Sequence, residues 1–191
     1  MGRRDRGTDT NVGAMPMTLF EQRANNFQTA IEMAKDRVED FGYGDEPAQE
    51  IVSRVYGSFI IWLTACEEAR LQNHYGITHS AYKRYVIDSL PEVDDASWQW
   101  SDYYGQGATL KRRASALWGL RTAFAHGDGD LRLVGSATNK KFAIGAANDL
   151  PGVQVSDQRV SLTAAIFHPA IKTVVQLQEV IPAQLCTRGS N

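Results

Sequence analysis

An arginine and a histidine stand five positions apart in LRTAFAHGDGD, residues 120–130, and both side chains could do chemistry. At about 100° per residue on a helix, Arg121 falls near the middle of an apolar face shared with Leu117, Phe124 and Ala125. A guanidinium cannot lose its proton to escape burial, so it needs a carboxylate, a ring of carbonyls, a partner subunit or an anionic ligand there. His126 could serve as a helix cap or as a proton carrier.

The angle between these two side chains leaves two interpretations open. Five residues correspond to roughly 140° around an ideal helix, so Arg121 and His126 do not simply share a face. Gly127 and Gly129 can end the helix in a left-handed conformation, which would let the imidazole swing toward a long arginine or meet the arginine of a second subunit. The structural alternative is that Arg121 forms a buried ion pair and His126 only closes the helix.

Other charged residues bear on this choice. Glu67 and Glu68 follow the apolar stripe of an earlier expected helix, so one of them could pair with Arg121 as a structural partner, as an orienting group, or as both. Three basic residues begin the helix that carries the motif: Lys111, Arg112 and Arg113. Such a run either forms a solvated face or contacts an RNA backbone.

The remaining histidines are not spaced as metal ligands. His74, His79 and His168 lack the i, i+4 spacing of a helical metal pair. We therefore expect no metal site and no cofactor.

The apolar periodicity predicts a mainly α fold built on four helices. The first begins at a capping box of Thr18 and Glu21 and reaches about Phe41; the second runs from Pro47 to Gly76. A shorter helix is expected over residues 80–90, and the fourth, residues 109–125, carries the motif. The helices must therefore position Arg121 and His126.

Short β-branched segments follow the fourth helix. DLRLVG, KKFAIG, GVQV and RVSL are separated by Asn, Gly and Asp turns, which predicts a short antiparallel hairpin or sheet inserted at this point. Pro169 can then open a C-terminal helix that continues to about Leu185.

Length and charge limit the classes of protein to consider. The 191 residues suit a single domain, expected over 18–186, with a flexible tail before it (1–17) and a short one after it (187–191). The 22 acidic and 20 basic side chains nearly cancel, so bulk charge does not steer the chain to nucleic acid. Cys66 and Cys186 lack the spacing of a disulfide framework, and no apolar run can serve as a signal or anchor, so we expect a soluble cytoplasmic protein.

Four helices with R-x4-H at the end of the fourth resemble the HEPN (higher eukaryotes and prokaryotes nucleotide-binding) domain. The family motif is an arginine followed four to six residues later by a histidine, and here it reads Arg121-Thr-Ala-Phe-Ala-His126. The resemblance covers residues from about Thr18 to Cys186. It implies a four-helix bundle plus a C-terminal helix.

The resemblance also implies an activity and partners. Many members are metal-independent endoribonucleases of toxin, phage-defence or CRISPR systems, and they act as homodimers in which two motifs face each other. His126 would then move a proton between the 2′-hydroxyl of single-stranded RNA and the leaving oxygen, while Arg121 stabilises charge on the phosphate. An antitoxin or other regulatory partner would fit such a role.

The chain departs from the family pattern at two positions. Active members usually carry Asn, Asp or His directly after the arginine, where this chain has Thr122 as a supporting residue. Toxins inactivated by adenylylation carry a tyrosine two residues after the histidine, where this chain has Asp128. The alternative prediction is therefore a non-catalytic HEPN-like dimer that binds RNA, a nucleotide or a partner protein.

Overall fold

The computed structural model describes residues 25, 27–29, 32, 33, 36, 45–76, 90 and 109–188. The expected N-terminal tail lies outside these residues, and so does the expected third helix apart from Leu90, which is buried. The described part is mainly helical, with a two-stranded antiparallel hairpin before the C-terminal helix, as the sequence predicts.

Helix α2, Asp45–Tyr75, is the longest described element and matches the expected second helix. Pro47 lies in its first turn, where a missing amide N–H costs no helical hydrogen bond. Gly76 follows the last turn with a φ of +65°, a conformation that glycine adopts without strain. Phe59, Ile60 and Leu63 are fully buried along one face, which makes α2 the spine of the core.

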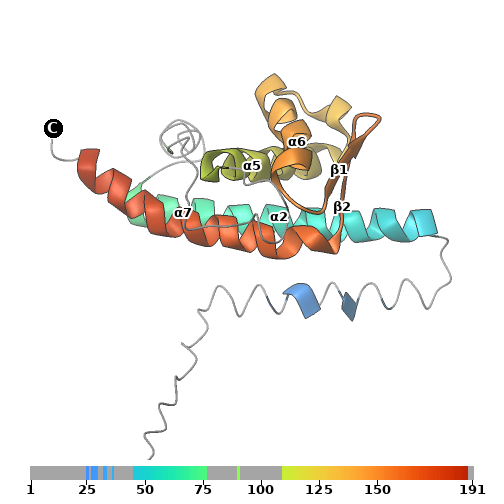
Figure 1. Cartoon of the computed structure of the whole chain (residues 1–191), viewed down its shortest axis with the longest axis horizontal. Coiled ribbons are helices and arrows are strands. Elements are labelled where there is room, and N and C mark those ends of the chain that lie inside the picture. Colours follow the sequence, from blue (N-terminus) through green and yellow to red (C-terminus); the bar gives the residue numbers. More distant parts are fainter. Residues whose placement is uncertain are drawn as a thin grey trace, which may run out of the picture.

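Two helices pack on α2 (Figure 1). Helix α5, Leu110–Gly127, runs in the opposite direction to α2, and α7, Phe167–Arg188, lies along it. Pro169 falls in the first turn of α7 as expected, but α7 continues three residues beyond the predicted end at Leu185. Residues 187 and 188 of the expected C-terminal tail are therefore helical, and residues 189–191 lie outside the described residues.

Part of the expected first helix is described. Asn25, residues 27–29, 32, 33 and 36 are helical, and the Gln28 side chain bonds to Glu32 one turn later. The Phe27 ring lies against two rings of α2, with centroids 5.4 Å from Phe59 and 5.7 Å from Trp62. An inward-facing Phe27 is what the helical spacing predicts.

Helix α6, Ala137–Asp149, corrects the prediction that KKFAIG is a strand. The hydroxyl of Ser136 caps its start by accepting from the amide N–H of Asn139 at 3.3 Å. Ala143, Ala146 and Leu150 are buried, at the spacing of one helical face. The six-residue segment was too short to show this period, which needs the following residues 146–150.

Helix α6 lies unusually close to α5. A Cβ at Gly119 of α5 would stand 2.4 Å from the backbone nitrogen of Ala143. Real Cβ atoms do not approach that closely, so only glycine permits this contact between the two helices.

The β section is smaller than the four predicted segments. Strands β1, Val153–Ser156, and β2, Arg159–Leu162, pair antiparallel with Val153 opposite Leu162, which confirms the predicted GVQV and RVSL hairpin. DLRLVG instead contains a 3₁₀ turn, η2 (Leu131–Leu133), with one isolated bridge from Asp130 to Arg159. A second 3₁₀ turn, η3 (Ala164–Ile166), leads from the hairpin into α7.

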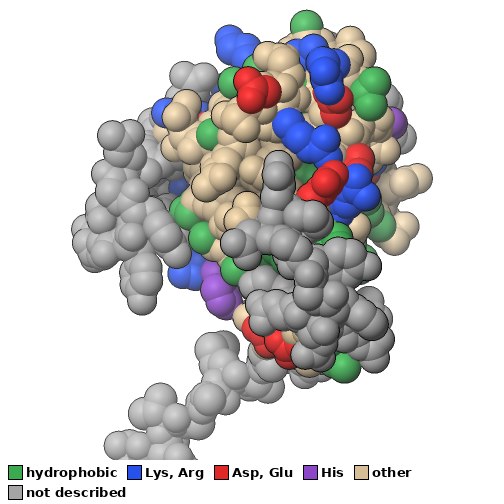
Figure 2. Space-filling model, turned by 90° about the vertical axis from the view of Figure 1, so that its right-hand side faces the viewer, with side chains coloured by type: hydrophobic (Ala, Val, Ile, Leu, Met, Phe, Trp, Pro, Cys, Tyr) green, Lys and Arg blue, Asp and Glu red, His purple; other side chains and the backbone are tan. Residues whose placement is uncertain are grey.

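Charges of both signs mix on the molecular surface. Figure 2 shows Lys and Arg side chains lying next to Asp and Glu side chains over one face, in keeping with the near-balance of charge in the sequence. None of the described helices combines the length and the apolar character that crossing a membrane requires.

Candidate active site

Helix α5 carries the arginine and histidine of the motif and is capped at both ends. Thr109 is its N-cap, and its hydroxyl accepts from the amide N–H of Arg112 at 3.2 Å. Asp128 ends the helix in the left-handed conformation with a φ of 49°, so Gly127 stays helical. The prediction that Gly127 itself adopts the left-handed turn is wrong, whereas Gly129 does so with a φ of +85°.

Arg121 lies at the edge of the buried face of α5 rather than at its middle. Its side chain is 22% exposed, and Ala125, expected on the same apolar face, is exposed. The Arg121 Nη2 atom stands 3.6 Å from Oε2 of Glu68 on α2, an ion pair too long for a hydrogen bond. The prediction that an acidic residue late in the second helix pairs with Arg121 is thus confirmed for Glu68.

The Glu68 carboxylate joins α2 to two side chains of α5. Its Oε1 accepts a hydrogen bond from the indole N–H of Trp118 at 3.0 Å, while Oε2 faces Arg121. The Arg121 Nε atom is buried and donates to no acceptor among the described residues. Glu68 therefore orients the guanidinium and leaves one of its donors unused.

Glu67 makes different contacts from those of Glu68. Its side chain is fully buried and receives hydrogen bonds from Nε and Nη2 of Arg70 at 2.8 and 2.7 Å. Nε2 of Gln178 on α7 also donates to it, at 3.0 Å. Glu67 thus holds α7 against α2 and makes no ion pair with Arg121 in the described structure.

Thr122, the residue after the arginine, is bonded within the fold. Its hydroxyl donates to the carbonyl oxygen of Trp118 at 3.0 Å and accepts from the Asn139 side-chain amide at 3.3 Å. Thr122 therefore ties α5 to α6 and is half-buried.

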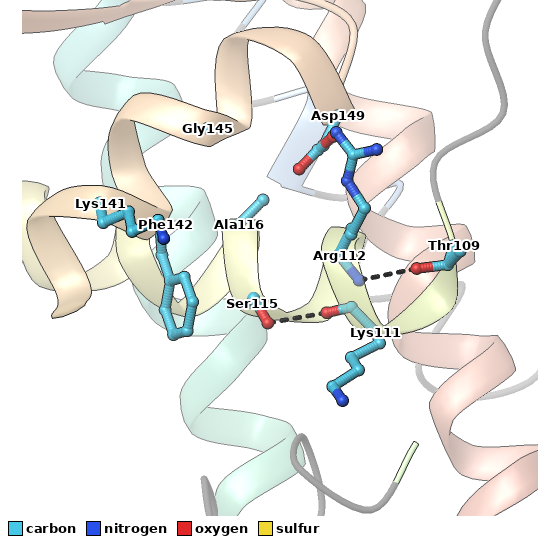
Figure 3. A pocket seen from close by; sticks show the side chains of 9 residues that line it. All are labelled: Thr109, Lys111, Arg112, Ser115, Ala116, Lys141, Phe142, Gly145 and Asp149. Carbon is cyan, nitrogen blue, oxygen red and sulfur yellow. Dashed lines mark hydrogen bonds and ion pairs between the residues drawn. The ribbon is translucent and has the colours of Figure 1, made fainter. Parts of the chain in front are cut away.

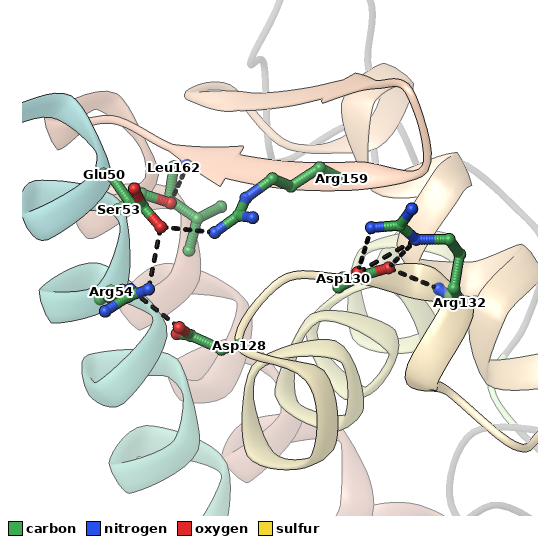
Figure 4. Close-up of polar contacts among 8 residues, drawn as sticks. All are labelled: Glu50, Ser53, Arg54, Asp128, Asp130, Arg132, Arg159 and Leu162. Atoms are coloured by element: carbon green, nitrogen blue, oxygen red, sulfur yellow. Dashed lines mark hydrogen bonds and ion pairs between the residues drawn. The ribbon is translucent and has the colours of Figure 1, made fainter. Parts of the chain in front are cut away.

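His126 lies in the last turn of α5 and is exposed. The chain beyond it is held by a set of surface ion pairs (Figure 4). Nε of Arg54 stands 2.8 Å from Oδ2 of Asp128, and Arg54 also pairs with Glu50 at 2.8 Å. The Glu50 carboxylate also forms an ion pair with Arg159 of β2, with Nη2 of Arg159 2.7 Å from Oε1 of Glu50. These contacts fix the turn that follows His126 while leaving its imidazole open to solvent.

The three basic residues at the start of α5 separate into three environments. Arg113 is only 4% exposed, and its Nη2 donates to the side-chain oxygen of Gln176 on α7 at 2.6 Å. Arg112 forms an ion pair with Asp149 at the end of α6, and Lys111 is half-buried. The expectation of one RNA-contacting run is therefore wrong for Arg113, since successive residues point about 100° apart on a helix.

A pocket that the sequence did not predict lies between α5 and α6. It is lined by Lys111 and Arg112 from α5 and by Lys141, Phe142 and Asp149 from α6. Because KKFAIG was predicted to be a strand, the helix that forms one side of this pocket was not expected. The N-cap Ser136 followed by a helical period of small residues was the signal that could have revealed it.

Neither family models, curated proteins nor solved structures gave a match to this chain. Within the described ranges, no three side chains of His, Cys, Asp or Glu are grouped to hold a metal ion. What the described site offers is an oriented arginine with an unused donor and an exposed histidine, both on one helix.

Proposed function

We propose that this chain is a HEPN-type, metal-independent endoribonuclease that acts as a homodimer on single-stranded RNA. The observation that carries the proposal is the state of Arg121. Glu68 orients its guanidinium, its Nε finds no acceptor among the described residues, and His126 is exposed near the end of the same helix. The Nε atom itself is closed to solvent, so a phosphate would contact the exposed part of the guanidinium, in a side chain that is 22% exposed overall.

The chemistry needs one proton carrier and one cation. The RNA 2′-oxygen attacks the adjacent phosphorus, so that an O2′–P bond forms while the P–O5′ bond breaks. One histidine accepts the 2′-hydroxyl proton, and a protonated histidine gives a proton to the leaving 5′-oxygen. Arg121 stabilises the extra negative charge on the phosphoryl oxygens during the transfer. The products are a 2′,3′-cyclic phosphate and a 5′-hydroxyl.

A second copy of the chain supplies the missing geometry. Arg121 points toward Glu68 of α2, whereas His126 leaves α5 roughly 140° further round the helix. In a two-fold dimer each residue type occurs twice in one composite site, so the Arg121 of one protomer can serve the His126 of its partner. The two histidines can then divide the tasks of acid and base.

The resemblance of the R-x4-H motif to that of HEPN proteins suggests a biological setting. We place the activity in the cytoplasm, in phage defence or toxin-like growth control. An antitoxin or other regulatory protein is the partner to look for.

The second candidate function is a non-catalytic dimeric module that binds RNA, a nucleotide or a partner protein. Two observations favour it. Glu68 already opposes the charge of Arg121, and the Thr122 hydroxyl is occupied within the fold. In such a module Arg121 and His126 would hold the interface between protomers.

Cleavage of mixed single-stranded RNA in EDTA separates the two candidates. We expect His126→Ala to lower the rate by about 10²–10⁴-fold and Arg121→Ala by about 10²–10³-fold. His168→Ala and Arg132→Ala are matched controls, because both side chains are exposed and stand outside the motif. Product ends are read by mass spectrometry, which should show cyclic phosphates.

Cleavage that both motif substitutions abolish and both controls preserve supports the nuclease. Absence of cleavage by a folded, dimeric wild-type protein supports the binding module. Cleavage that survives both motif substitutions would contradict the assignment of Arg121 and His126.

A further inference from the structure

The pocket between the first half of α5 and α6 has about 550 Å³ (Figure 3). That volume falls within the roughly 300–1,000 Å³ typical of small-molecule sites. Its lining reaches Ser115 and Ala116 on α5, about 15 Å along the helix axis from His126 at 1.5 Å per residue. Ala116 comes five residues before Arg121, about 7.5 Å along the same axis, so the pocket neighbours the motif, and neither Arg121 nor His126 lines it.

Positive charge predominates at this pocket. Lys111, Arg112 and Lys141 line it, against a single carboxylate, Asp149. Asp149 forms an ion pair with Arg112, so these two charges offset each other. Lys141 is exposed, and no ion pair joins it to any other part of the chain that the structure describes. The positive charge of Lys141 at the pocket favours an anion.

The rest of the lining is apolar or small. Phe142 forms one wall, and Ala116 and Gly145 lie along the neighbouring surfaces of α5 and α6 (Figure 3). The pocket is thus amphipathic, with an apolar interior beside lysine ammonium groups. A flat ring system that carries a phosphate is complementary to both halves, because rings pack on apolar and aromatic surfaces while phosphates attract lysine.

We propose that this pocket binds a nucleotide, with its base against Phe142 and Ala116 and its phosphate near Lys141 and Lys111. The source can be one unit of an RNA strand or a free mononucleotide, since both present the same chemistry. Binding of an RNA strand rests on the proposed function, because an RNA strand lying along α5 would reach from the pocket toward His126. Binding of a free mononucleotide does not depend on the proposed function.

Two substitutions test the pocket directly. Lys141→Ala removes the exposed cation, and Lys140→Ala is its matched control, being the adjacent lysine of α6 outside the lining. Gly145→Leu fills the pocket. A Cβ there meets only Asp149 Oδ2, at 3.9 Å, so the backbone tolerates the change. Ala147→Leu, on the exposed side of α6, controls for added bulk.

Binding is measured on the full chain in EDTA by calorimetry with the four nucleoside 5′-monophosphates. The second probe is a fluorescent mixed-sequence single-stranded RNA, read by anisotropy in the His126→Ala background. We expect Gly145→Leu to weaken binding about tenfold. Lys141→Ala should also reduce the slope of log K against log salt for the RNA by about 0.7. Both control variants should bind as the parent does.

Each outcome has one meaning. Mononucleotide binding that Gly145→Leu weakens supports a free-nucleotide site, and weakening seen only with RNA supports a strand site. No binding of either probe, or binding that neither Lys141→Ala nor Gly145→Leu changes in a folded protein, overturns the inference. If wild-type protein cleaves no RNA but pocket variants weaken binding, the nuclease proposal fails and the pocket stands. If wild-type protein cleaves RNA but the pocket variants leave binding unchanged, the pocket proposal fails and the nuclease stands.

Discussion

At the scale of single residues, the structure distinguishes charged side chains that the sequence presents as equivalent. Glu67 and Glu68 are neighbours, yet Glu67 is fully buried against Arg70 and Gln178, while Glu68 faces Trp118 and Arg121. Glu68 touches no substrate in the proposed reaction, so it is a positioning residue for the Arg121 guanidinium.

We expect Glu68→Gln to lower RNA cleavage about tenfold or more, as loss of an orienting partner commonly does. The glutamine can still accept from the Trp118 indole, but the melting temperature should fall, because the Arg121 and Glu68 side chains are only 22% and 16% exposed and the guanidinium loses its carboxylate. Glu179→Gln on the exposed side of α7 is the control. Rescue by Glu68→Asp would separate positioning from packing, and an unchanged rate in Glu68→Gln would contradict the role.

Asp130 offers a test of local electrostatics. The Arg132 side chain hydrogen-bonds its carboxylate at 2.6 to 3.1 Å and lowers its pKa to about 2 from an ordinary 3.8. Because the folded-state pKa is the lower one, the stability from this contact is complete above pH 3.8 and is lost as the pH falls through about 2.

We expect a carboxyl-carbon NMR titration of Asp130 to give a midpoint near 2 and Arg132→Ala to move it upward. Arg159→Ala should move it less, because Arg159 is the weakest of the causes that lower this pKa. If Arg132→Ala leaves the titration midpoint of Asp130 unchanged, the ion pair between Asp130 and Arg132 does not form in solution.

At the scale of elements, the contact of α5 with α6 depends on one glycine. A hydrogen bond from Asn139 to Thr122 joins the same two helices, so it and the close contact at Gly119 hold α5 against α6 together. The pocket proposed to bind a nucleotide lies along the same seam.

We expect Gly119→Ala to destabilise the protein by about 1–3 kcal/mol, because a Cβ would stand 2.4 Å from the Ala143 backbone nitrogen and force the helices apart. Gly145→Ala is the matched control within α6, where the nearest atom is 3.9 Å away. It should instead stabilise by about 0.5–1 kcal/mol, since alanine favours a helix over glycine. Urea denaturation measures both, and equal effects of the two substitutions would contradict the close contact.

At the scale of the whole molecule, the proposed reaction needs two chains. Each 21.2 kDa chain carries one Arg121 and one His126 at different angles on α5. A composite site built across a two-fold axis brings an arginine of one protomer to the histidine of the other.

We expect a mixture of Arg121→Ala and His126→Ala proteins to regain part of the cleavage that neither has alone, because the one remaining histidine must act as both base and acid. Random re-association makes about half of the dimers mixed, and each mixed dimer keeps one arginine and one histidine on opposite chains. Sedimentation confirms that mixed dimers form, and unmixed samples are the control. Mixed dimers without activity would show that one arginine and one histidine on opposite chains do not make a working site, because both residues must come from one chain or because both histidines are required.

Local signals determined much of the architecture from the sequence alone. The starts of α2, α5 and α7 follow from Pro47, Thr109 and Pro169, and the end of α2 follows from Gly76, because such signals act within a turn of the residue itself. The GVQV and RVSL hairpin is equally local. The R-x4-H spacing likewise needs only residues 121–126.

Tertiary structure alone decided which charged residues meet. The buried arginine of α5 is Arg113 and not Arg121, because α7 brings Gln176 to that side of the helix. Glu68 meets Arg121 because α2 and α5 run antiparallel and set those two turns side by side. The pocket likewise exists only because α6 packs against α5. Periodicity reports which face of a helix is apolar, whereas the partner that covers it comes from residues distant in the chain.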